Sequence, residues 1–231
     1  MRTSPTVRSA VRQGVSVGLA TGAYGISFGA LSVAAGLDVW QTCVLSLLMF
    51  TGGSQFAFIG VIGAGGAGAA ATATAALLGV RNSLYGLQMA SLLRPRGLLR
   101  VGAAQVTIDE STAVALAQPD PPARRAGFWA AGLGVFVFWN LATLAGALLG
   151  DVLGDPARWG LDGAAAAAFL ALLWPRLKQK QAQAIGVVAA VVAAIAIPLS
   201  PAGIPVLAAA AVTAAIAWWQ YREPPHVRSG S

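Results

Sequence analysis

Long apolar stretches, separated by short links rich in glycine, proline and charge, make up almost the whole chain. A helix needs about 20 consecutive apolar residues to span a bilayer, and several of these stretches approach or exceed that length. The pattern therefore predicts an all-α polytopic integral membrane protein with about six to eight hydrophobic helices. The predicted helical segments are 14–35, 41–63, 67–92, 102–118, 128–150, 162–175, 182–199 and 203–221.

The ends of the chain differ in composition from this apolar region. Residues 1–13 form a basic N-terminal segment that we place on the cytoplasmic side. Residues 14–221 form one predicted transmembrane domain, because no link between the apolar segments is long enough for a soluble domain. Residues 222–231 form a polar C-terminal tail that contains two prolines.

The composition supports a lipid-facing surface. Of the 231 residues, 57% are apolar and 10% are charged, and the mean hydropathy is +0.70. About a quarter of the residues of an average soluble domain are charged. The net charge of +7 comes from Lys and Arg in the links rather than along one soluble face. That distribution is typical of charges retained on the cytoplasmic side of a membrane, so we expect no nucleic-acid partner.

The basic links also bear on the number of membrane crossings. Simple alternation from a cytoplasmic N-terminus would place the link with Arg94, Arg96 and Arg100 outside, against the charge rule. The conflict disappears if segments 41–63 and 102–118, which "TGGSQ" and "DE" interrupt, do not cross fully. Broken or re-entrant helices occur at membrane depth where they are buried in protein or line a cavity. We therefore expect some of the helices to be broken or re-entrant.

Glycines recur in the first apolar segment at spacings of four, four, three and four residues, which places them on one helix face. A face without side chains lets another helix backbone approach closely. We assign these glycines to helix packing, although such a face can also line a narrow substrate path. The face consists of Gly14, Gly18, Gly22, Gly25 and Gly29, continued by Ser32 and Gly36.

The stretch "FTGGSQF" places small and polar residues inside an apolar segment. Paired glycines weaken a helix by about 1 kcal/mol each relative to alanine, and they expose backbone amides and carbonyls. An exposed helix end can bind the carboxylate or ammonium of a small zwitterion. The alternative is a kink in which the glutamine bonds to a neighbouring helix. The candidate substrate-binding residues here are Thr51, Gly52, Gly53, Ser54 and Gln55.

A second candidate stretch is "GVRNSLYGLQ", in the third apolar segment. Asn82 lies on one helix face with two glycines, and Arg81 lies on another with Tyr85. A charge near the centre of a membrane segment costs at least about 2.5 kcal/mol, so it is functional by default. The alternative is that Arg81 lies near the membrane edge and extends to the surface. We predict that Arg81, Asn82 and Tyr85 contribute to substrate binding.

The fourth apolar segment contains two adjacent carboxyls in "QVTIDESTAVAL". On a continuous helix, Gln105, Asp109 and Thr112 form a polar stripe, whereas Glu110 lies on an apolar face. Apolar surroundings disfavour an ionised carboxylate, so Glu110, with Asp109 beside it, is the candidate for proton coupling. The alternative is that both carboxyls lie at the cytoplasmic rim, where they cap helices or pair with Arg94–Arg100.

The remaining polar residues carry less information. Asp162 opens an apolar segment, where a carboxylate suits a helix N-terminus. His226, the only histidine, lies in the tail, so no histidine relay is expected within the membrane. The chain has no phosphate-binding loop, no nucleophile elbow and no H-E-x-x-H pair. We therefore expect no enzymatic activity, no cofactor and no metal.

Several of these stretches together resemble the AzlC family, the large subunit of bacterial branched-chain amino acid exporters of the LIV-E type. The resemblance spans most of the chain, and its "F-x-G-x-S-Q-F" and "R-x-x-L-Y-G" elements are fairly specific. The matching stretches are "GISFGALSVAAGLDVWQTCVLSLLMFTGGSQFAFIGVI", "VRNSLYG", "DES" and "GLDGAAAAAFLALL".

The resemblance implies a multi-pass permease of the bacterial cytoplasmic membrane. It would export leucine, isoleucine, valine and methionine, coupled to the proton gradient, together with a small AzlD-like membrane subunit. Two positions depart from the family pattern. Family members often have a histidine where this chain has Asn82, and a proline common in the counterpart of "GLDGAAAAAF" is missing. If that histidine couples protons elsewhere, the task falls here on Asp109 or Glu110, or coupling is absent.

Two other functions remain open from the sequence. The chain could be a channel for a small neutral solute, with "TGGSQ" as its filter. It could also be a membrane assembly protein without transport, in which the glycine face serves only helix contacts. Dependence of flux on the proton gradient distinguishes a secondary transporter from a channel, and the absence of flux with the partner present favours the assembly protein.

Overall fold

The computed structural model describes residues 4–153, 158, 170, 173–174 and 176–222. Every regular element in this part of the chain is helical, which confirms the all-α class. Three of its helical stretches are long and apolar enough to cross a membrane, namely Pro5–Ala34, Pro121–Gly150 and Lys180–Leu199. Most of the predicted segment 162–175, including Asp162, and the tail with His226 lie outside the described residues.

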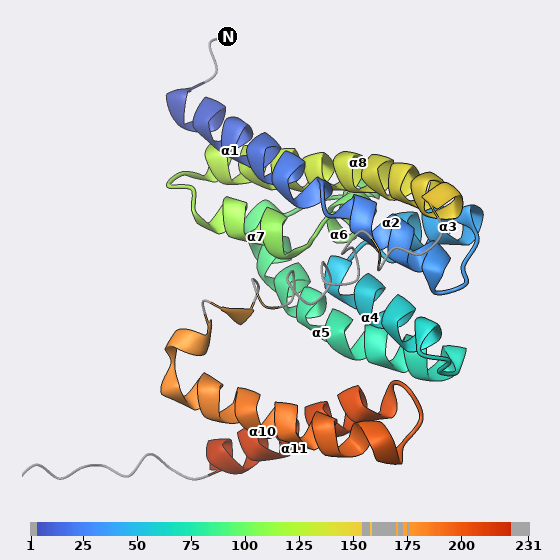
Figure 1. Cartoon of the computed structure of the whole chain (residues 1–231). Helices are drawn as coiled ribbons and strands as arrows, with labels where there is room; N and C mark the ends of the chain where they lie inside the picture. Colours follow the sequence, from blue (N-terminus) through green and yellow to red (C-terminus); the bar gives the residue numbers. More distant parts are fainter. Residues whose placement is uncertain (1–3, 154–157, 159–169, 171–172, 175, 223–231) are drawn as a thin grey trace, which may run out of the picture.

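The elements follow the predicted order of apolar segments (Figure 1). The α-helices are α1 (Pro5–Gly22), α2 (Gly25–Ala34), α3 (Val39–Leu48), α4 (Gly52–Gly63), α5 (Gly68–Leu93), α6 (Leu98–Gln105), α7 (Asp109–Leu116), α8 (Pro121–Leu153), α10 (Lys180–Ala196) and α11 (Ile204–Arg222). Two short 3₁₀ helices, η2 (Arg176–Lys178) and η3 (Ile197–Leu199), flank α10.

Three of the predicted helices are each divided into two. Segment 41–63 forms α3 and α4, and segment 102–118 forms α6 and α7, so both predicted interruptions are confirmed. The breaks themselves differ from the prediction. Extended backbone interrupts the first at Thr51, and Gly52 and Gly53 begin α4 rather than disrupting it. Asp109 and Glu110 likewise form the first turn of α7, where the helix dipole favours negative charge.

The first apolar segment is also divided, which the sequence did not predict. α1 ends at Gly22 and α2 begins at Gly25. α1 begins at Pro5, well before residue 14, because Ser4 Oγ accepts a hydrogen bond from Val7 N at 3.3 Å and proline suits the first helical position. Arg8 and Arg12 therefore belong to the first turns of a helix.

Side-chain caps define where α3 and α7 begin. Asp38 Oδ1 accepts from Gln41 N at 2.7 Å, and Gln41 Oε1 accepts from Asp38 N at 3.0 Å, which is a reciprocal capping box. At α7, Ser111 Oγ accepts from Ile108 N at 3.0 Å. These local bonds satisfy amides that would otherwise have no partner, so each half-helix has a defined first turn.

α1 and α2 lie along α8, and glycines line the contact (Figure 1). A Cβ atom added at Gly18 would lie 2.8 Å from the carbonyl carbon of Gly134, and one at Gly25 would lie 2.5 Å from Trp139 O. On α8, a Cβ atom at Gly150 would lie 2.9 Å from Ala30 Cα. The backbones therefore touch without room for any side chain.

The glycine face ends sooner than the sequence spacing indicates. Ser32 is completely buried, and its Oγ donates to Phe28 O at 2.7 Å. Gly36 instead lies beyond the end of α2 with a φ of 99°, and it is exposed, with no atom within 4 Å of an added Cβ. Its role is to allow the turn into α3, since a left-handed conformation favours glycine.

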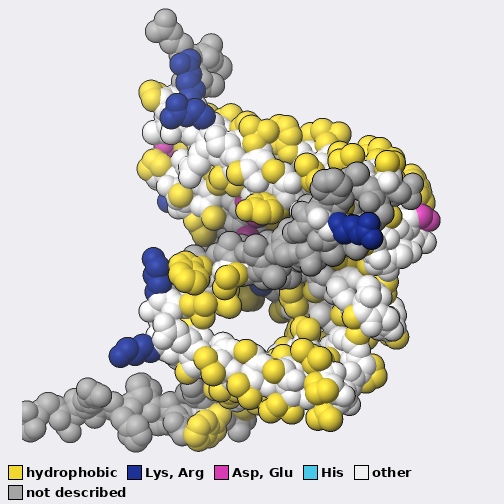
Figure 2. All heavy atoms as spheres, in the orientation of Figure 1, with side chains coloured by type: hydrophobic (Ala, Val, Ile, Leu, Met, Phe, Trp, Pro, Cys, Tyr) yellow, Lys and Arg dark blue, Asp and Glu magenta, His cyan; other side chains and the backbone are white. Residues whose placement is uncertain are grey.

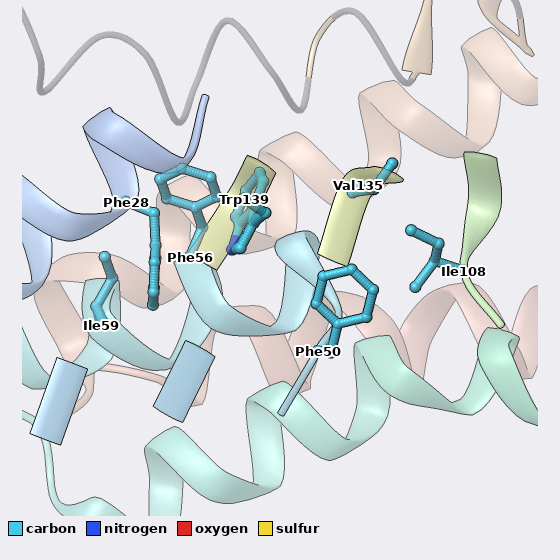
Figure 3. Packing of buried hydrophobic residues seen from close by; sticks show 7 residues of the cluster. All are labelled: Phe28, Phe50, Phe56, Ile59, Ile108, Val135 and Trp139. Atoms are coloured by element: carbon cyan, nitrogen blue, oxygen red, sulfur yellow. The ribbon is translucent and has the colours of Figure 1, made fainter. Parts of the chain in front are cut away.

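An aromatic cluster holds the two broken helices against α8 (Figure 3). Phe28 of α2 packs edge-to-face on Phe56 of α4, with ring centroids 5.7 Å apart, and stacks near Trp139 of α8 at 6.1 Å. Phe50 and Ile108 enter the same cluster from the two helix breaks. The irregular backbone therefore lies inside the protein rather than against lipid, as membrane depth requires.

The outer surface is strongly apolar. Figure 2 shows hydrophobic side chains over the visible face of the α1–α8 layer and over the α10–α11 hairpin, with Lys and Arg in a few separate groups. Trp40, Leu48 and Val152 are each at least 75% exposed. Such a surface suits hydrocarbon rather than water. The orientation of the chain relative to the membrane stays a prediction.

We predict that Gly18→Ala destabilises the fold by about 1–3 kcal/mol, because the new methyl group has to displace the backbone of α8. The matched control is Gly86→Ala on α5, where no atom lies within 4 Å of the added Cβ. That variant should be neutral or gain up to about 1 kcal/mol from helix propensity. Thermal unfolding of the detergent-solubilised variants measures both effects. Equal melting temperatures for the two variants would contradict close backbone packing at Gly18.

Candidate binding site

The α3–α4 break, the α6–α7 break, α5 and α8 surround a cavity of about 240 Å³. Its polar wall comes from the start of α4, the middle of α5 and the start of α7. Three stretches that are far apart in sequence therefore meet at one place. The polar wall residues are Thr51, Gly52, Gly53, Arg81, Asn82, Asp109 and Glu110, and Thr21 and Tyr24 border the cavity from the end of α1.

The N-terminus of α4 presents free backbone amides at the cavity. Thr51 is extended, with φ of −157°, and its side chain makes no capping bond. The first hydrogen bond of the helix runs from Gln55 N to Thr51 O at 3.0 Å. The amides of Gly52, Gly53 and Ser54 consequently have no acceptor among the described residues. Free amides at a positive helix end are a general binding site for anionic groups.

Arg81 and Asp109 form an ion pair in the cavity wall. Arg81 Nη2 lies 3.0 Å from Asp109 Oδ2, and the two side chains are 35% and 23% exposed. The pair connects α5 to the start of α7, which excludes the alternative in which Asp109 pairs with Arg94–Arg100. Arg81 Nε and Asp109 Oδ1 still lack partners in the described part of the chain. Each member of the pair can therefore bind a further group.

Two neutral polar groups of the wall are also buried without a partner. They are Asn82 Oδ1 on α5 and Trp139 Nε1 on α8. More than about 90% of buried polar groups in folded proteins are hydrogen-bonded, so unpartnered ones mark a site for a ligand or for water. Together with the free amides of α4, the cavity offers both donors and acceptors.

The opposite side of the cavity is apolar. Phe50, Phe56, Ile108, Val135 and Trp139 belong to the wall and to the aromatic cluster described above (Figure 3). A Cβ atom added at Gly52 would lie 3.2 Å from Trp139 Cη2, so glycine at this position keeps the space beside the indole open. The cavity therefore has one polar and one apolar side.

Gln55, which the sequence analysis assigned to substrate binding, does not line this cavity. It is completely buried, and its Nε2 donates to Ser46 O at 3.3 Å across the α3–α4 break. This geometry matches the alternative given in the sequence analysis, in which the glutamine bonds to a neighbouring helix at a kink. Ser54 is 1% exposed, and neither Ser54 nor Tyr85 of α5 belongs to the wall. Of the five candidate residues in "FTGGSQF", Thr51, Gly52 and Gly53 line the cavity.

The predicted polar stripe of Gln105, Asp109 and Thr112 is not continuous, because the break at Val106–Ile108 separates Gln105 from the other two, which both lie in α7. Gln105 Nε2 donates to Leu47 O at 2.7 Å, whereas Asp109 faces Arg81. Thr112 is buried and not part of the cavity wall. Glu110, predicted on an apolar face, instead lines the cavity beside Asp109.

The apolar wall residues were not predicted from the sequence. Phe50, Ile108, Val135 and Trp139 each lie within long apolar stretches, where nothing distinguishes a cavity wall from ordinary core. Among these four residues, only Trp139 could have been recognised from the sequence as a candidate, because its indole N–H in the middle of an apolar helix requires a polar partner.

Broken helices that meet around a small cavity with one polar and one apolar side are a feature of many membrane transporters. The comparison with protein families gives the particular family: the AzlC protein family matches residues 16–153, more than half of the chain, so the chain belongs to this family. The family is linked to branched-chain amino acid transport. Every residue of the cavity wall lies within the match, whereas α10 and α11 lie outside it. No curated protein and no solved structure matches the chain.

We predict that Arg81 and Asp109 are energetically coupled. Arg81→Gln and Asp109→Asn should each lower the melting temperature, because each leaves one charge unpaired in the wall. The double variant should lose less stability than the sum of the single variants, with an interaction energy of about 0.5–3 kcal/mol. A double-mutant cycle of thermal unfolding measures this value. Strict additivity would show that the ion pair contributes nothing to the fold.

Proposed function

We propose that the chain is the large subunit of a secondary transporter that exports branched-chain amino acids, and methionine, across the bacterial cytoplasmic membrane. The proton gradient drives the export, and a small AzlD-like membrane protein is the second subunit. One observation carries the proposal: the cavity combines a free helix N-terminus, an ion pair and an apolar wall. The membership of the AzlC family supports the same substrate class.

The two sides of the cavity complement the two parts of an apolar amino acid. The substrate carboxylate accepts hydrogen bonds from the amides of Gly52 and Gly53, where the helix dipole is also favourable. The substrate ammonium binds the free Oδ1 of Asp109, with Glu110 beside it. The branched side chain then lies against Ile108, Val135 and Trp139, where burial contributes about 0.8 kcal/mol for each CH₂ group.

The size of the cavity limits the substrate to small molecules. Its volume of about 240 Å³ lies below the roughly 300–1,000 Å³ of pockets for drug-sized ligands. A single amino acid suits this volume, whereas a peptide does not. The apolar wall disfavours polar amino acids, whose side chains would lose their hydrogen bonds to water without replacement.

In the empty site, the ion pair balances the charges of Arg81 and Asp109. Without substrate, Arg81 neutralises Asp109, which leaves Glu110 as the remaining acidic group among the cavity residues. A bound zwitterion brings its own positive and negative groups and shares Asp109 with Arg81. Binding can therefore loosen the contact between α5 and α7, the two elements that the ion pair connects. Transport requires such a change of contacts between two conformations.

We predict saturable leucine counterflow in liposomes that contain the chain and its small partner. Unlabelled isoleucine, valine and methionine should inhibit uptake of labelled leucine, because all present both charged groups and an apolar side chain. The amine 3-methylbutylamine and the acid 4-methylpentanoate should inhibit at least tenfold less, because each lacks one charged group.

A matched pair of variants tests the cavity itself. Gly52→Val fills the space beside Trp139 and should reduce counterflow at least tenfold. Gly60→Val on the same helix is the control, because no atom lies within 4 Å of the added Cβ. Equal counterflow by the two variants would remove the cavity from the binding site. Flux that does not saturate would favour a channel, and no flux with the partner present would favour an assembly protein.

We predict that Glu110→Gln abolishes proton-driven export and retains exchange of labelled for unlabelled leucine. A glutamine cannot carry a proton, but it preserves the shape of the cavity. Asp109→Asn should instead impair both activities, because it removes the partner of Arg81 and of the substrate ammonium. The measurement is leucine accumulation under an imposed pH gradient, compared with exchange without one. Accumulation by Glu110→Gln against a leucine gradient would show that Glu110 is not the proton carrier.

A further inference from the structure

A second cavity, of about 510 Å³, lies between the α5–α6 link and the beginning of α8. Arg94 and Arg96 of the link and Arg125 of α8 contribute its charged side chains. Leu93, Leu99 and Trp129 contribute its apolar side. No residue of this cavity lines the substrate cavity.

The link that carries two of the arginines has a defined conformation. Arg94 is left-handed, with φ of 49°, and its N–H donates to Ala90 O at 3.1 Å. The ring of Pro95 fixes its own φ at about −65°, and Gly97 is also left-handed, with φ of 56°. A left-handed residue other than glycine costs roughly 1–2 kcal/mol. The link therefore holds Arg94 and Arg96 at the cavity at some cost to stability, as is frequent at functional sites.

The apolar side is anchored equally well. Leu93 is 7% exposed and belongs to a buried cluster with Phe128. Trp129 packs edge-to-face against Phe128, with ring centroids 5.4 Å apart. The cavity is therefore a preformed feature of the junction between α5, α6 and α8.

The three arginines are not neutralised within the described part of the chain. None of them has an ion pair or a side-chain hydrogen bond there, although each guanidinium has five N–H donors. The neighbouring Arg124 differs, because its Nε donates to Gln118 O at 2.9 Å. The nearby carboxylate of Asp120 accepts from Ala123 N at 2.8 Å and caps α8. Three guanidinium groups that line one cavity, with no ion pair among the described residues, favour a multivalent oxyanion, for which phosphate has the matching geometry.

The geometry points to a binding site for the phosphate group of an anionic membrane lipid. A free phosphate ion would use the arginines but not the apolar side of the cavity. A lipid uses both, because its acyl chains can continue from Leu99 over the adjacent Leu98 and Val101, which are 89% and 69% exposed. Basic pockets between membrane helices recognise lipid headgroups in this manner. This site is separate from the proposed substrate site.

Native mass spectrometry of the full chain in detergent tests the proposal. The probes are dioleoylphosphatidylglycerol, which is anionic, and dioleoylphosphatidylcholine, which is zwitterionic. The wild type should retain the anionic lipid at least fivefold more than the zwitterionic one. The triple variant Arg94→Gln/Arg96→Gln/Arg125→Gln should lose this preference. Arg100→Gln is the matched control, because it removes the same charge from the neighbouring turn but not from the cavity.

Two further measurements make the outcome decisive. Should the triple variant fail to fold, Arg125→Gln alone should lower retention of the anionic lipid at least twofold, since Arg125 lies on a regular helix. The anionic lipid should raise the melting temperature of the wild type. Inorganic phosphate at about 5 mM, a concentration that would largely fill a site with a Kd of roughly 1 mM, should not raise it. Equal lipid retention by the wild type and the cavity variant, or by the cavity variant and Arg100→Gln, would overturn the proposal. Equal stabilisation by inorganic phosphate and by lipid would also overturn it.

Discussion

The need to satisfy backbone polar groups at the helix breaks governs the rest of this structure. A break inside an apolar environment exposes carbonyl groups on one half-helix and amide groups on the other, and each unsatisfied group costs several kcal/mol in a bilayer. At the end of α3, three successive carbonyls find protein donors: Leu45 O accepts from Met49 N, Ser46 O from Gln55 and Leu47 O from Gln105. At the start of α4, the amides of Gly52, Gly53 and Ser54 have no acceptor in the described part of the chain. The carbonyl groups on the α3 side of the break therefore have donors, whereas the amide groups on the α4 side lack acceptors among the described residues. The α4 side faces the cavity.

This asymmetry explains the use of glutamine at Gln55, which is buried, and at Gln105, which is half-buried. Gln55 and Gln105 come from different half-helices, yet both donate to the last turn of α3. They join α3, α4 and α6 at the level of the cavity without lining it. The glycine contacts between α1, α2 and α8 act on the other side of the same cavity, since they place the α1–α2 junction and Trp139 together. Rigid surroundings of this kind allow the cavity wall to keep several unpartnered polar groups.

The sequence predicted the elements better than it predicted the site. Apolar length and glycine spacing are local properties of the sequence. The helical segments, two of the three breaks and the all-α class could therefore be predicted from it. Thr51, Gly52, Gly53, Arg81, Asn82, Asp109 and Glu110 were chosen as polar exceptions in apolar segments, and the structure places them together. Gln55 met the same criterion but bonds across the break, because a polar exception can serve either a ligand or the backbone. The pairing of Arg81 with Asp109 and the wall position of Val135 depend on which helices become neighbours, and no local pattern contains that information.

The charges of the site bear on how the proposed proton coupling works. Arg81 and Asp109 cancel, so the net charge of the wall depends on Glu110 alone among the cavity residues. A bound amino acid is a zwitterion and leaves that net charge unchanged. A proton on Glu110 changes the net charge from −1 to zero, which substrate binding alone cannot do. Moving one charge through a membrane potential of 100 mV is worth about 2.3 kcal/mol. In the proposed cycle, protonation of Glu110 therefore determines whether the conformational change of the loaded site moves charge across the membrane. The substrate determines only whether Asp109 is shared between Arg81 and the substrate ammonium.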